Sequence, residues 1–289
     1  MRLSILIPTY NTSCLSLVRE LHSQLPADCE IIVGDDGSNH ADIRTENRRI
    51  EALRGVTYWE SAENLGRARI RNRLAEMAHG EYLLFIDSDA KVLRTDFVEK
   101  YLQCLTTQAV VCGGTLHPDT LPSPKVSLRW RYEKSCEPRF TAERRNEHPY
   151  QSLSTFNILI PKSVALAHPF DEDIRQYGYE DTLLGSILEE ADIKVYHIDN
   201  PLIHLGLDDN KHFLQKTEEA MRTLYDLGEK MDGLSNLLNV YRKLQRLHLI
   251  GLVRITYKIS RPLLRRNLLG SRPSVQLFNF YKLGYYASL

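Results

Sequence analysis

Two aspartates two residues apart, Asp87 and Asp89, directly follow an apolar run at residues 82–86. A run of this length, bounded by Gly80 and by charges, predicts a strand buried on both faces. Side chains alternate along a strand, so the two carboxylates project to the same side. Ligands of open α/β sheets bind outside the carboxyl ends of strands, and two carboxylates there can hold a divalent cation and, through it, a diphosphate. The first hypothesis is therefore a nucleotide-dependent transferase, although an isolated Asp-x-Asp is also compatible with an acidic turn that faces water.

Three more polar clusters stand where strands are expected to end. They are Pro-Thr-Tyr-Asn at 8–11, Asp-Asp-Gly-Ser at 35–38, and Asn-Leu-Gly-Arg at 64–67, which begins a helix. Any one of them is compatible with an ordinary turn, since turns are rich in Asn, Asp, Gly and Ser. Adjacent parallel strands, however, bring such ends to one edge of a sheet. Four clusters in register therefore indicate a binding site.

The elements that must position these clusters alternate between strand and helix. Strands are expected at residues 3–8, 30–34, 55–59, 81–86, 109–113, 156–160 and, as the last one, 194–198, and helices at 15–25, 67–78 and 180–190. This order predicts βαβ units and an α/β fold with a mainly parallel sheet flanked by helices. Residues 117–150 are expected to be an irregular, charged insertion. We expect one domain at 1–207 and a helical, basic C-terminal extension at 208–289, with Pro262 and Pro273 as helix breaks.

The composition is that of an ordinary globular chain of 289 residues, with 43% hydrophobic and 26% charged residues. Its five cysteines are odd in number and have no C-x-x-C spacing, which argues against a disulfide framework or a zinc site. No stretch approaches the roughly 20 apolar residues of a membrane span, and the apolar run at 2–8 is too short for a signal peptide. The protein is therefore expected in the cytoplasm.

The net charge of zero conceals an asymmetry. Residues 233–289 hold ten Lys or Arg and no Asp or Glu, whereas residues 1–232 hold 27 basic and 37 acidic residues. Basic amphipathic helices can lie on an anionic membrane surface, which would suit a peripheral protein at the cytoplasmic face that acts on a lipid-linked acceptor. A helical extension packed on the acidic body, or a dimer contact, is equally compatible. Nucleic acid is a weaker interpretation, because no recognised binding motif accompanies the charge.

In order and spacing, the clusters in residues 1–205 resemble family 2 of the inverting GT-A glycosyltransferases, within the nucleotide-diphospho-sugar transferase superfamily. The resemblance extends to Cys-Gly-Gly at 112–114, to Gly-Tyr-Glu-Asp at 178–181 before a helix, and to His204 after the last expected strand. It implies a GT-A fold and transfer of a hexosyl or N-acetylhexosaminyl group. The donor would be a nucleotide-diphosphate sugar, most simply a UDP-sugar, and the acceptor a glycan or lipid-linked hydroxyl in cell-surface glycan or polysaccharide biosynthesis.

The resemblance also implies which residues bind the nucleotide sugar. They are Pro8, Thr9, Tyr10, Asn11, Asp36, Asn64, Gly66, Arg69, Asp87 and Ser88. Asp36 would accept a hydrogen bond from N3–H of uracil, and a carboxylate discriminates well against a base that lacks this donor. Gly66 would permit close backbone contact with the diphosphate. The neighbouring Asp35 is compatible with a turn cap, and Arg67 and Arg71 with solvated helix positions.

For the cation, the resemblance makes Asp89 a direct ligand of Mn²⁺ or Mg²⁺. Asp87 would contact the ribose or reach the metal through water. His204 matches a further metal ligand of some family members, and an imidazole ligand favours Mn²⁺ over Mg²⁺. A packed or solvated histidine is the alternative.

The proton transfer is expected at Glu180 and Asp181. An inverting transfer is a single displacement that needs one carboxylate to take the acceptor proton. The two side chains diverge by about 100° on a helix, so only one can point at the acceptor. The resemblance makes Asp181 the base and gives Glu180 an acceptor hydroxyl. Acids at a helix start also complement the helix dipole.

Two other functions fit a similar sheet. Sugar-phosphate nucleotidyltransferases typically carry a Gly-rich phosphate loop after the first strand, and the Pro-Thr-Tyr-Asn sequence at 8–11 argues against them. A non-catalytic, membrane-associated GT-A-like adaptor is the other, and the presence of all four aspartates (Asp36, Asp87, Asp89 and Asp181) argues against degeneration.

Overall fold

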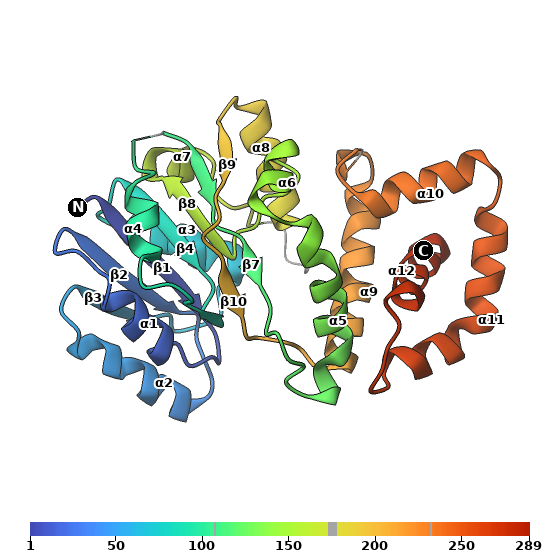
Figure 1. The fold of residues 1–289 in the computed structure, drawn as a ribbon, viewed down its shortest axis with the longest axis horizontal. Coiled ribbons are helices and arrows are strands. Elements are labelled where there is room, and N and C mark those ends of the chain that lie inside the picture. Colours follow the sequence, from blue (N-terminus) through green and yellow to red (C-terminus); the bar gives the residue numbers. More distant parts are fainter. Residues whose placement is uncertain (107, 173–177, 232) are drawn as a thin grey trace. The chain divides into compact units, whose positions relative to one another are not determined.

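The computed structural model describes residues 1–106, 108–172, 178–231 and 233–289. The strands are β1 (Leu3–Thr9), β2 (Cys29–Asp35), β3 (Val56–Glu60), β4 (Tyr82–Ile86), β5 (Ala90–Lys91), β6 (Val110–Cys112), β7 (Thr115–Leu116), β8 (Asn157–Pro161), β9 (Val195–His197) and β10 (Leu202–His204). The α-helices are α1 (Leu15–His22), α2 (Ala41–Asn47), α3 (Arg67–Met77), α4 (Phe97–Leu102), α5 (Ser127–Cys136), α6 (Ala142–Glu147), α7 (Lys162–Ala167), α8 (Glu180–Glu190), α9 (Asn210–Leu227), α10 (Asn236–Arg246), α11 (Ile250–Leu268) and α12 (Val275–Ser288). Figure 1 follows them from blue to red.

The chain divides into two compact units. Unit 1 comprises 1–116, 139–175 and 180–206, and unit 2 comprises 117–138, 176–179 and 207–289. Every residue expected from the sequence to bind donor or metal, or to transfer a proton, belongs to unit 1. Within the described residues, no helix is both long enough and apolar enough to cross a membrane.

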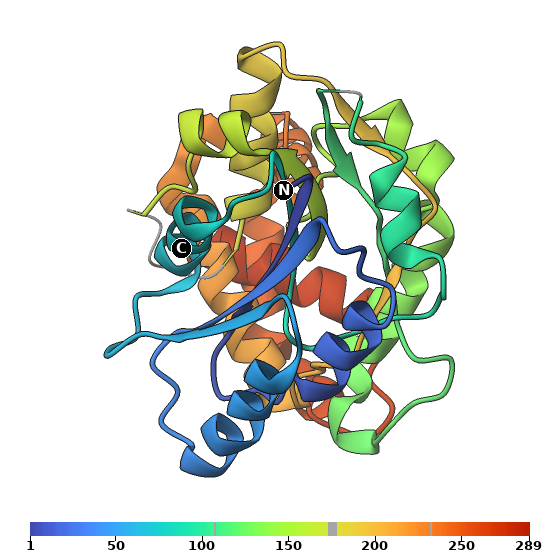
Figure 2. The same ribbon diagram turned by 90° about the vertical axis from the view of Figure 1, so that its left-hand side faces the viewer.

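A seven-stranded sheet of order β3-β2-β1-β4-β8-β6-β9 forms the centre of unit 1. The first four strands are parallel neighbours, as Figure 2 shows, and β8 runs antiparallel between β4 and β6. In this register Thr9 lies opposite Asp35, and Asp35 opposite Glu60. The carboxyl ends of β1, β2 and β3 therefore meet at one edge, as expected for a mainly parallel α/β sheet.

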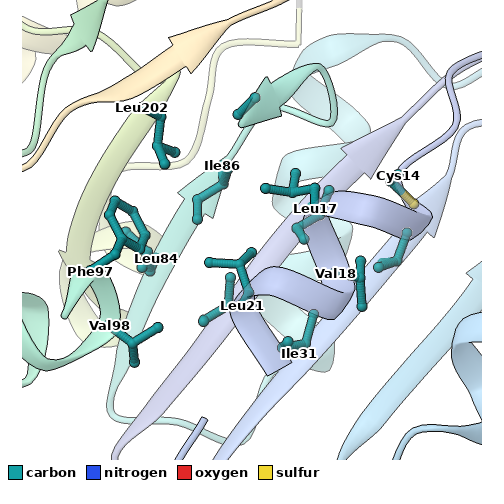
Figure 3. Close-up of a cluster of buried hydrophobic side chains, with 14 of the residues drawn as sticks. Cys14, Leu17, Val18, Leu21, Ile31, Leu84, Ile86, Phe97, Val98 and Leu202 are labelled. Atoms are coloured by element: carbon teal, nitrogen blue, oxygen red, sulfur yellow. The ribbon is translucent and has the colours of Figure 1, made fainter. Parts of the chain in front are cut away.

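Both faces of this sheet are buried, because side chains alternate along each strand. On one face Ile5 and Ile7 of β1 belong to an apolar cluster with residues of α1 and α4. Figure 3 shows part of this cluster, with Leu17 and Val18 of α1 and Phe97 of α4 labelled. On the other face Leu6 belongs to a second apolar cluster, which includes residues of α3, α7 and α8. This explains the continuous apolar runs that predicted the strands from sequence.

A small second sheet of order β5-β10-β7 lies beside the polar end of β4. In it His204 pairs with Ala90 in the antiparallel β5–β10 ladder. The expectation that 194–198 is the last strand was therefore wrong, since β10 follows and His204 is part of it. A strand of three residues, paired with strands of two, is too short to produce a visible alternation in the sequence.

Unit 2 is helical, with α12 surrounded by α5, α9, α10 and α11 (Figure 1). Close approach of α11 and α12 requires Gly284, where a Cβ atom would come within 2.5 Å of the Tyr257 ring. Two almost completely buried rings of α12 face different helices, with Tyr281 against Tyr257 of α11 and Phe278 against Tyr132 of α5 and Phe213 of α9. The prediction of a helical C-terminal region is confirmed.

Two expectations about helices were wrong. Residues 117–150 are largely helical, because charges that appeared irregular in sequence form helical pairs, such as Arg129 with Glu133 at 2.9 Å.

Pro262 lies inside α11 and does not break it. Its neighbours Leu264 and Leu268 are buried, and this packing offsets the hydrogen bond that proline cannot donate. Pro273 does separate α11 from α12, as expected.

Candidate active site

Asp87 lies at the end of β4 between two arginines of α3. Arg71 donates to Asp87 Oδ1, and Arg67 lies 3.6 Å from Oδ2. The Arg71 side chain is only 4% exposed, so the interpretation of this residue as a solvated helix position was wrong. Positions four apart share a helix face, and the Arg67–Arg71 spacing was the sequence signal for this arrangement. The two guanidinium groups hold the Asp87 carboxylate in place.

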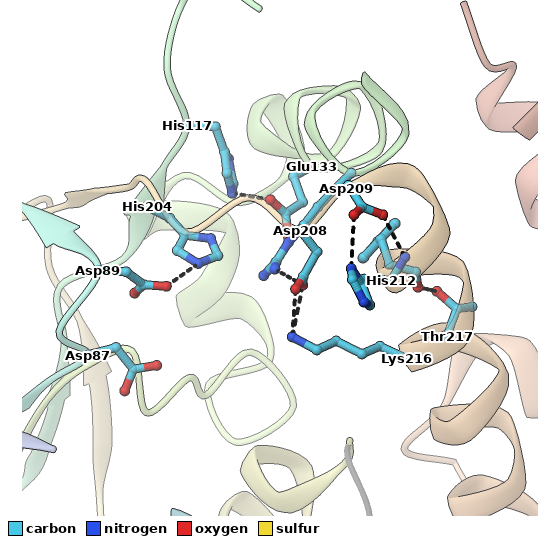
Figure 4. Close-up of polar contacts among 12 residues, drawn as sticks. Asp87, Asp89, His117, Glu133, His204, Asp208, Asp209, His212, Lys216 and Thr217 are labelled. Carbon is cyan, nitrogen blue, oxygen red and sulfur yellow. Dashed lines mark hydrogen bonds and ion pairs between the residues drawn. The ribbon is translucent and has the colours of Figure 1, made fainter. Parts of the chain in front are cut away.

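Asp89 faces the imidazole of His204 across the small sheet (Figure 4). Their Oδ2 and Nε2 atoms are 3.2 Å apart, and the Leu205 amide donates to the Asp89 carbonyl. Gly206 approaches so closely that a Cβ atom there would lie 1.8 Å from Asp89 Oδ2. The structure thus brings together two of the residues expected to hold a metal, and glycine keeps a side chain away from the carboxylate.

Glu180, the first residue of α8, lies near Arg67, one of the two arginines that face Asp87. Its Oε1 lies 3.6 Å from Nε of Arg67, which also faces Asp87. Arg67 thereby links the acids after β4 to the acids at the helix start, and it was missed as a site residue from sequence.

Asp181 accepts a hydrogen bond from the hydroxyl of Thr155 at 2.7 Å. Burial raises the pKa of Asp181, the nearby Glu180 carboxylate raises it further, and the Thr155 hydrogen bond opposes both. Thr155 precedes Phe156, whose carbonyl accepts from the Asp87 amide at 3.1 Å. The chain before β8 therefore connects Asp181 to Asp87, a connection for which the sequence carried no signal.

Asp36 is buried at the end of β2. Its two carboxylate oxygens accept from the backbone amides of Leu65 and Gly66, at 2.7 and 3.0 Å. Desolvation raises the pKa of Asp36, partly offset by these two amides. Gly66 has φ +90°, a conformation that favours glycine, and α3 begins just after it. Asp36 thus fixes the loop that starts α3.

The Asp35 carboxylate stabilises the turn at residues 35–38 and does not face the open edge of the sheet. It is fully buried, accepts from the Ser38 amide at 2.6 Å, and accepts from the Tyr58 hydroxyl at 2.7 Å. The two adjacent acids therefore have different structural tasks, with Asp35 holding its own turn and Asp36 the neighbouring loop.

The residues after β1 divide between buried and exposed positions. The Thr9 hydroxyl donates to the Thr12 carbonyl, and the Asn11 side-chain oxygen accepts from the amides of Asn39 and His40. Tyr10 is 45% exposed and offers a free-standing ring at this edge. Pro8 and Ser88 are half-buried and Asn64 is exposed.

Arg69 points along a different direction from Arg67 and Arg71. Its Nε lies 3.1 Å from Glu172, and both side chains are about half exposed. Asn72, on the same side of α3, also donates to Glu172. The structure therefore places Arg69 in a surface ion pair, apart from the Asp87 network.

Comparison with known proteins shows the family to which this chain belongs. Residues 4–164, more than half of the chain, match the family model of glycosyl transferase family 2. The chain belongs to glycosyl transferase family 2. The resemblance inferred from the sequence motifs is thereby confirmed.

A relative of known sequence extends the family assignment beyond the matched segment. EpsH of Bacillus subtilis (strain 168), named as a glycosyltransferase, is 33% identical over 259 residues, which covers 83% of this chain and 72% of EpsH. This family 2 chain is thus a glycosyltransferase over most of its length.

Solved structures confirm the fold. TarS of S. aureus in complex with UDP-GlcNAc has a TM-score of 0.50 at 16% identity, covering 75% of this chain and 65% of that one. The mannosyltransferase PcManGT of Pyrobaculum calidifontis, in complex with GDP-Man and Mn²⁺, has a TM-score of 0.57 at 15% identity, covering 99% and 73%. The family 2 chain has the expected GT-A fold, with additional C-terminal helices.

Proposed function

We propose that this family 2 enzyme transfers a sugar from a UDP-sugar to a glycan or lipid-linked hydroxyl, with inversion at the anomeric carbon and with the help of a divalent cation. The observation that carries the proposal is the convergence, within unit 1, of Asp36, Asp87 and Asp181 on the edge that also holds the Asp89–His204 pair. Ordinary stability does not require so many acids at one sheet edge.

The donor set at Asp89 and His204 fits a divalent metal. A carboxylate oxygen and an imidazole nitrogen lie 3.2 Å apart, close enough to bind one ion together, and their mixed chemistry suits Mn²⁺. The Asp89 side chain is 30% exposed, and any side chain at position 206 would collide with its Oδ2. Asp87 is the weaker candidate for direct ligation, because Arg71 and Arg67 already face both of its oxygens. A bound cation would offset charge on the departing diphosphate.

Asp181 is the proposed general base. The acceptor oxygen forms the new bond to the anomeric carbon, the bond from that carbon to the diphosphate breaks, and the acceptor proton passes to the Asp181 carboxylate. A raised pKa makes a carboxylate a better proton acceptor, and Asp181 has this property through burial beside Glu180. Glu180, held near Arg67, would bind an acceptor hydroxyl.

Asp36 supports the choice of uracil. A carboxylate has lone pairs beyond the two that accept from Leu65 and Gly66, so N3–H of a uracil ring still has an acceptor. Tyr10 directly follows β1, the neighbour of β2, and its exposed ring can stack on the nucleotide base. TarS and PcManGT are solved with UDP-GlcNAc and GDP-Man respectively, so both nucleotides belong in the test.

A donor panel tests this function. The full chain is heated with UDP-GlcNAc, UDP-glucose, UDP-galactose or GDP-mannose, each with and without Mn²⁺, and the midpoint of unfolding is followed. A ligand that binds only the folded state raises this midpoint. We expect a UDP-sugar with Mn²⁺ to give the largest rise. A larger rise with GDP-mannose would refute the uracil assignment, and no rise with any donor would refute the proposed function.

A further inference from the structure

Helix α11 of unit 2 carries a stripe of apolar side chains that face solvent. Leu252, Ile255, Ile259 and Leu263 are 63%, 61%, 75% and 70% exposed. At 100° per residue these four positions fall within about 80° of the helix circumference. They therefore form one continuous stripe, which we call the α11 stripe.

The α11 stripe is not simply the outer side of a poorly packed helix. The opposite side of α11 is buried through Tyr257, Leu264 and Leu268, and Tyr257 packs on Gly284 of α12. Helix α11 thus has two apolar sides, of which only one is covered in the described chain. Contiguous exposed apolar surface of this kind marks an interaction site more often than a stability feature.

The surroundings of the stripe are basic. Residues 233–289 contain no Asp or Glu. Basic residues that are exposed on α10 and α11 are Lys243, Arg246, Arg254, Lys258, Arg261 and Arg266. In a helix projection Lys258 borders the stripe and Arg266 lies in line with it, whereas the Arg254 side chain donates to the Ala287 carbonyl of α12. The partner of this surface must therefore accept apolar insertion and also carry negative charge.

These two requirements select among three occupants. Two copies of the chain would bring their basic flanks together, and like charges repel. Single-stranded nucleic acid is bound through aromatic stacking, whereas the stripe is aliphatic. An anionic lipid surface offers phosphates at its headgroups and an apolar layer just beneath them, which is the environment of basic amphipathic helices.

We propose that α11 lies on an anionic membrane surface, with the α11 stripe inserted between the lipid headgroups and the flanking Lys and Arg residues at the phosphates. The proposal goes beyond the proposed transfer reaction and does not depend on it, because it uses only residues of unit 2 and needs no donor.

Vesicle flotation of the full chain tests the proposal. We expect the wild-type protein to float with vesicles of phosphatidylcholine mixed with phosphatidylglycerol, and to float weakly with phosphatidylcholine alone. High salt should reduce the binding, because it screens the basic flank. The I255S/I259S double variant should bind at least about tenfold more weakly, because two inserted aliphatic side chains are lost.

A matched control removes exposed apolar side chains elsewhere. Leu93 and Leu166 of unit 1 are 47% and 50% exposed, and the L93S/L166S variant should float like wild type. The stripe variant should keep the midpoint of thermal unfolding and its rise with donor, which separates loss of membrane binding from loss of the proposed function. In a further variant, I259W, fluorescence should shift to the blue when anionic vesicles are added.

Several results would overturn the proposal. They are equal flotation of the wild-type and stripe variants, absence of wild-type flotation with anionic vesicles, and a wild-type dimer in light scattering that the stripe variant dissociates in the absence of lipid. Oligonucleotide binding that is lost in the stripe variant, without any vesicle binding, would also overturn it.

Discussion

Unit 1 and unit 2 depart from ordinary burial in opposite ways. Unit 1 holds charged side chains in half-buried or buried positions at its sheet edge, with Arg71 and Asp87 as the clearest pair. Unit 2 exposes the four apolar residues of the α11 stripe to solvent. A buried charge and an exposed apolar stripe are the two deviations that most often have a functional cause. In our two proposals the units therefore meet different partners, a charged small molecule at the sheet edge of unit 1 and a lipid surface at the α11 stripe of unit 2.

The largest expected effect comes from the base in unit 1. Asp181→Asn removes the proton acceptor, and we expect hydrolysis of a UDP-sugar with Mn²⁺ to fall by about 10²–10⁴-fold. The donor-induced rise in the unfolding midpoint should remain, because Asp181 does not bind the donor in our proposal. Turnover close to that of wild type would remove Asp181 from the mechanism.

Arg71→Met tests whether the buried charges of unit 1 act as a unit. Breaking a buried ion pair leaves Asp87 without its main partner, and we expect the free energy of unfolding to fall by about 3 kcal/mol. The control, Arg69→Met on the same helix, breaks the half-exposed pair with Glu172 and should change it by less than about 1 kcal/mol. Urea unfolding of both variants measures the difference. Equal losses would mean that exposure does not distinguish the two pairs.

Asp89→Asn tests the metal assignment. An amide is a weaker ligand than a carboxylate, so we expect the affinity for Mn²⁺ in the presence of UDP to fall by about 10–100-fold. Isothermal titration of wild type, Asp89→Asn and His204→Ala measures it. Wild-type affinity in Asp89→Asn would place the ion elsewhere.

The effect that is smallest per pH unit concerns a buried side chain of unit 2. Lys282 of α12 packs its ammonium 4.2 Å above the Tyr132 ring and 3.0 Å from the Tyr132 hydroxyl. Burial lowers the pKa of Lys282 from 10.5 to about 8. Between these two values the unfolded chain keeps a proton that the folded chain has lost, so stability should increase with pH by up to about 1.4 kcal/mol per unit.

Lys282→Met has no such proton and provides the control. The difference in the free energy of unfolding between wild type and this variant, followed by urea unfolding from pH 7 to about pH 10.5, should therefore increase in favour of wild type. A constant difference would show that Lys282 is not desolvated, and that the pKa of its side chain is the same in the folded and the unfolded chain.

The sequence predicted most of unit 1 because its strands are buried on both faces. Such strands appear as continuous apolar runs, and the polar residues that follow β1, β2 and β4 mark where they end. The edge of the sheet could therefore be assembled from residue order alone. Short strands such as β10 depend on pairing with distant segments, and no local pattern reveals them.

The site residues that were missed act through other side chains. Thr155 orients Asp181, and Arg67 and Arg71 hold Asp87, in contacts that join residues up to 26 positions apart. The α11 stripe was only partly visible, because the sequence shows two apolar sides of one helix without showing which of them α12 covers. Burial, rather than periodicity, distinguishes the packed side from the exposed one.

The central claim is that the sheet edge of unit 1 performs a single displacement with Asp181 as the base. Proton NMR of freshly started UDP-sugar hydrolysis, with Mn²⁺ and water as the acceptor, tests it most directly, because the anomer released first reports the stereochemistry before mutarotation. From an α-linked donor we predict that the β-sugar appears first in wild type and that Asp181→Asn releases almost none. Initial release of the α-sugar, or β-sugar formed at an unchanged rate by Asp181→Asn, would contradict the claim.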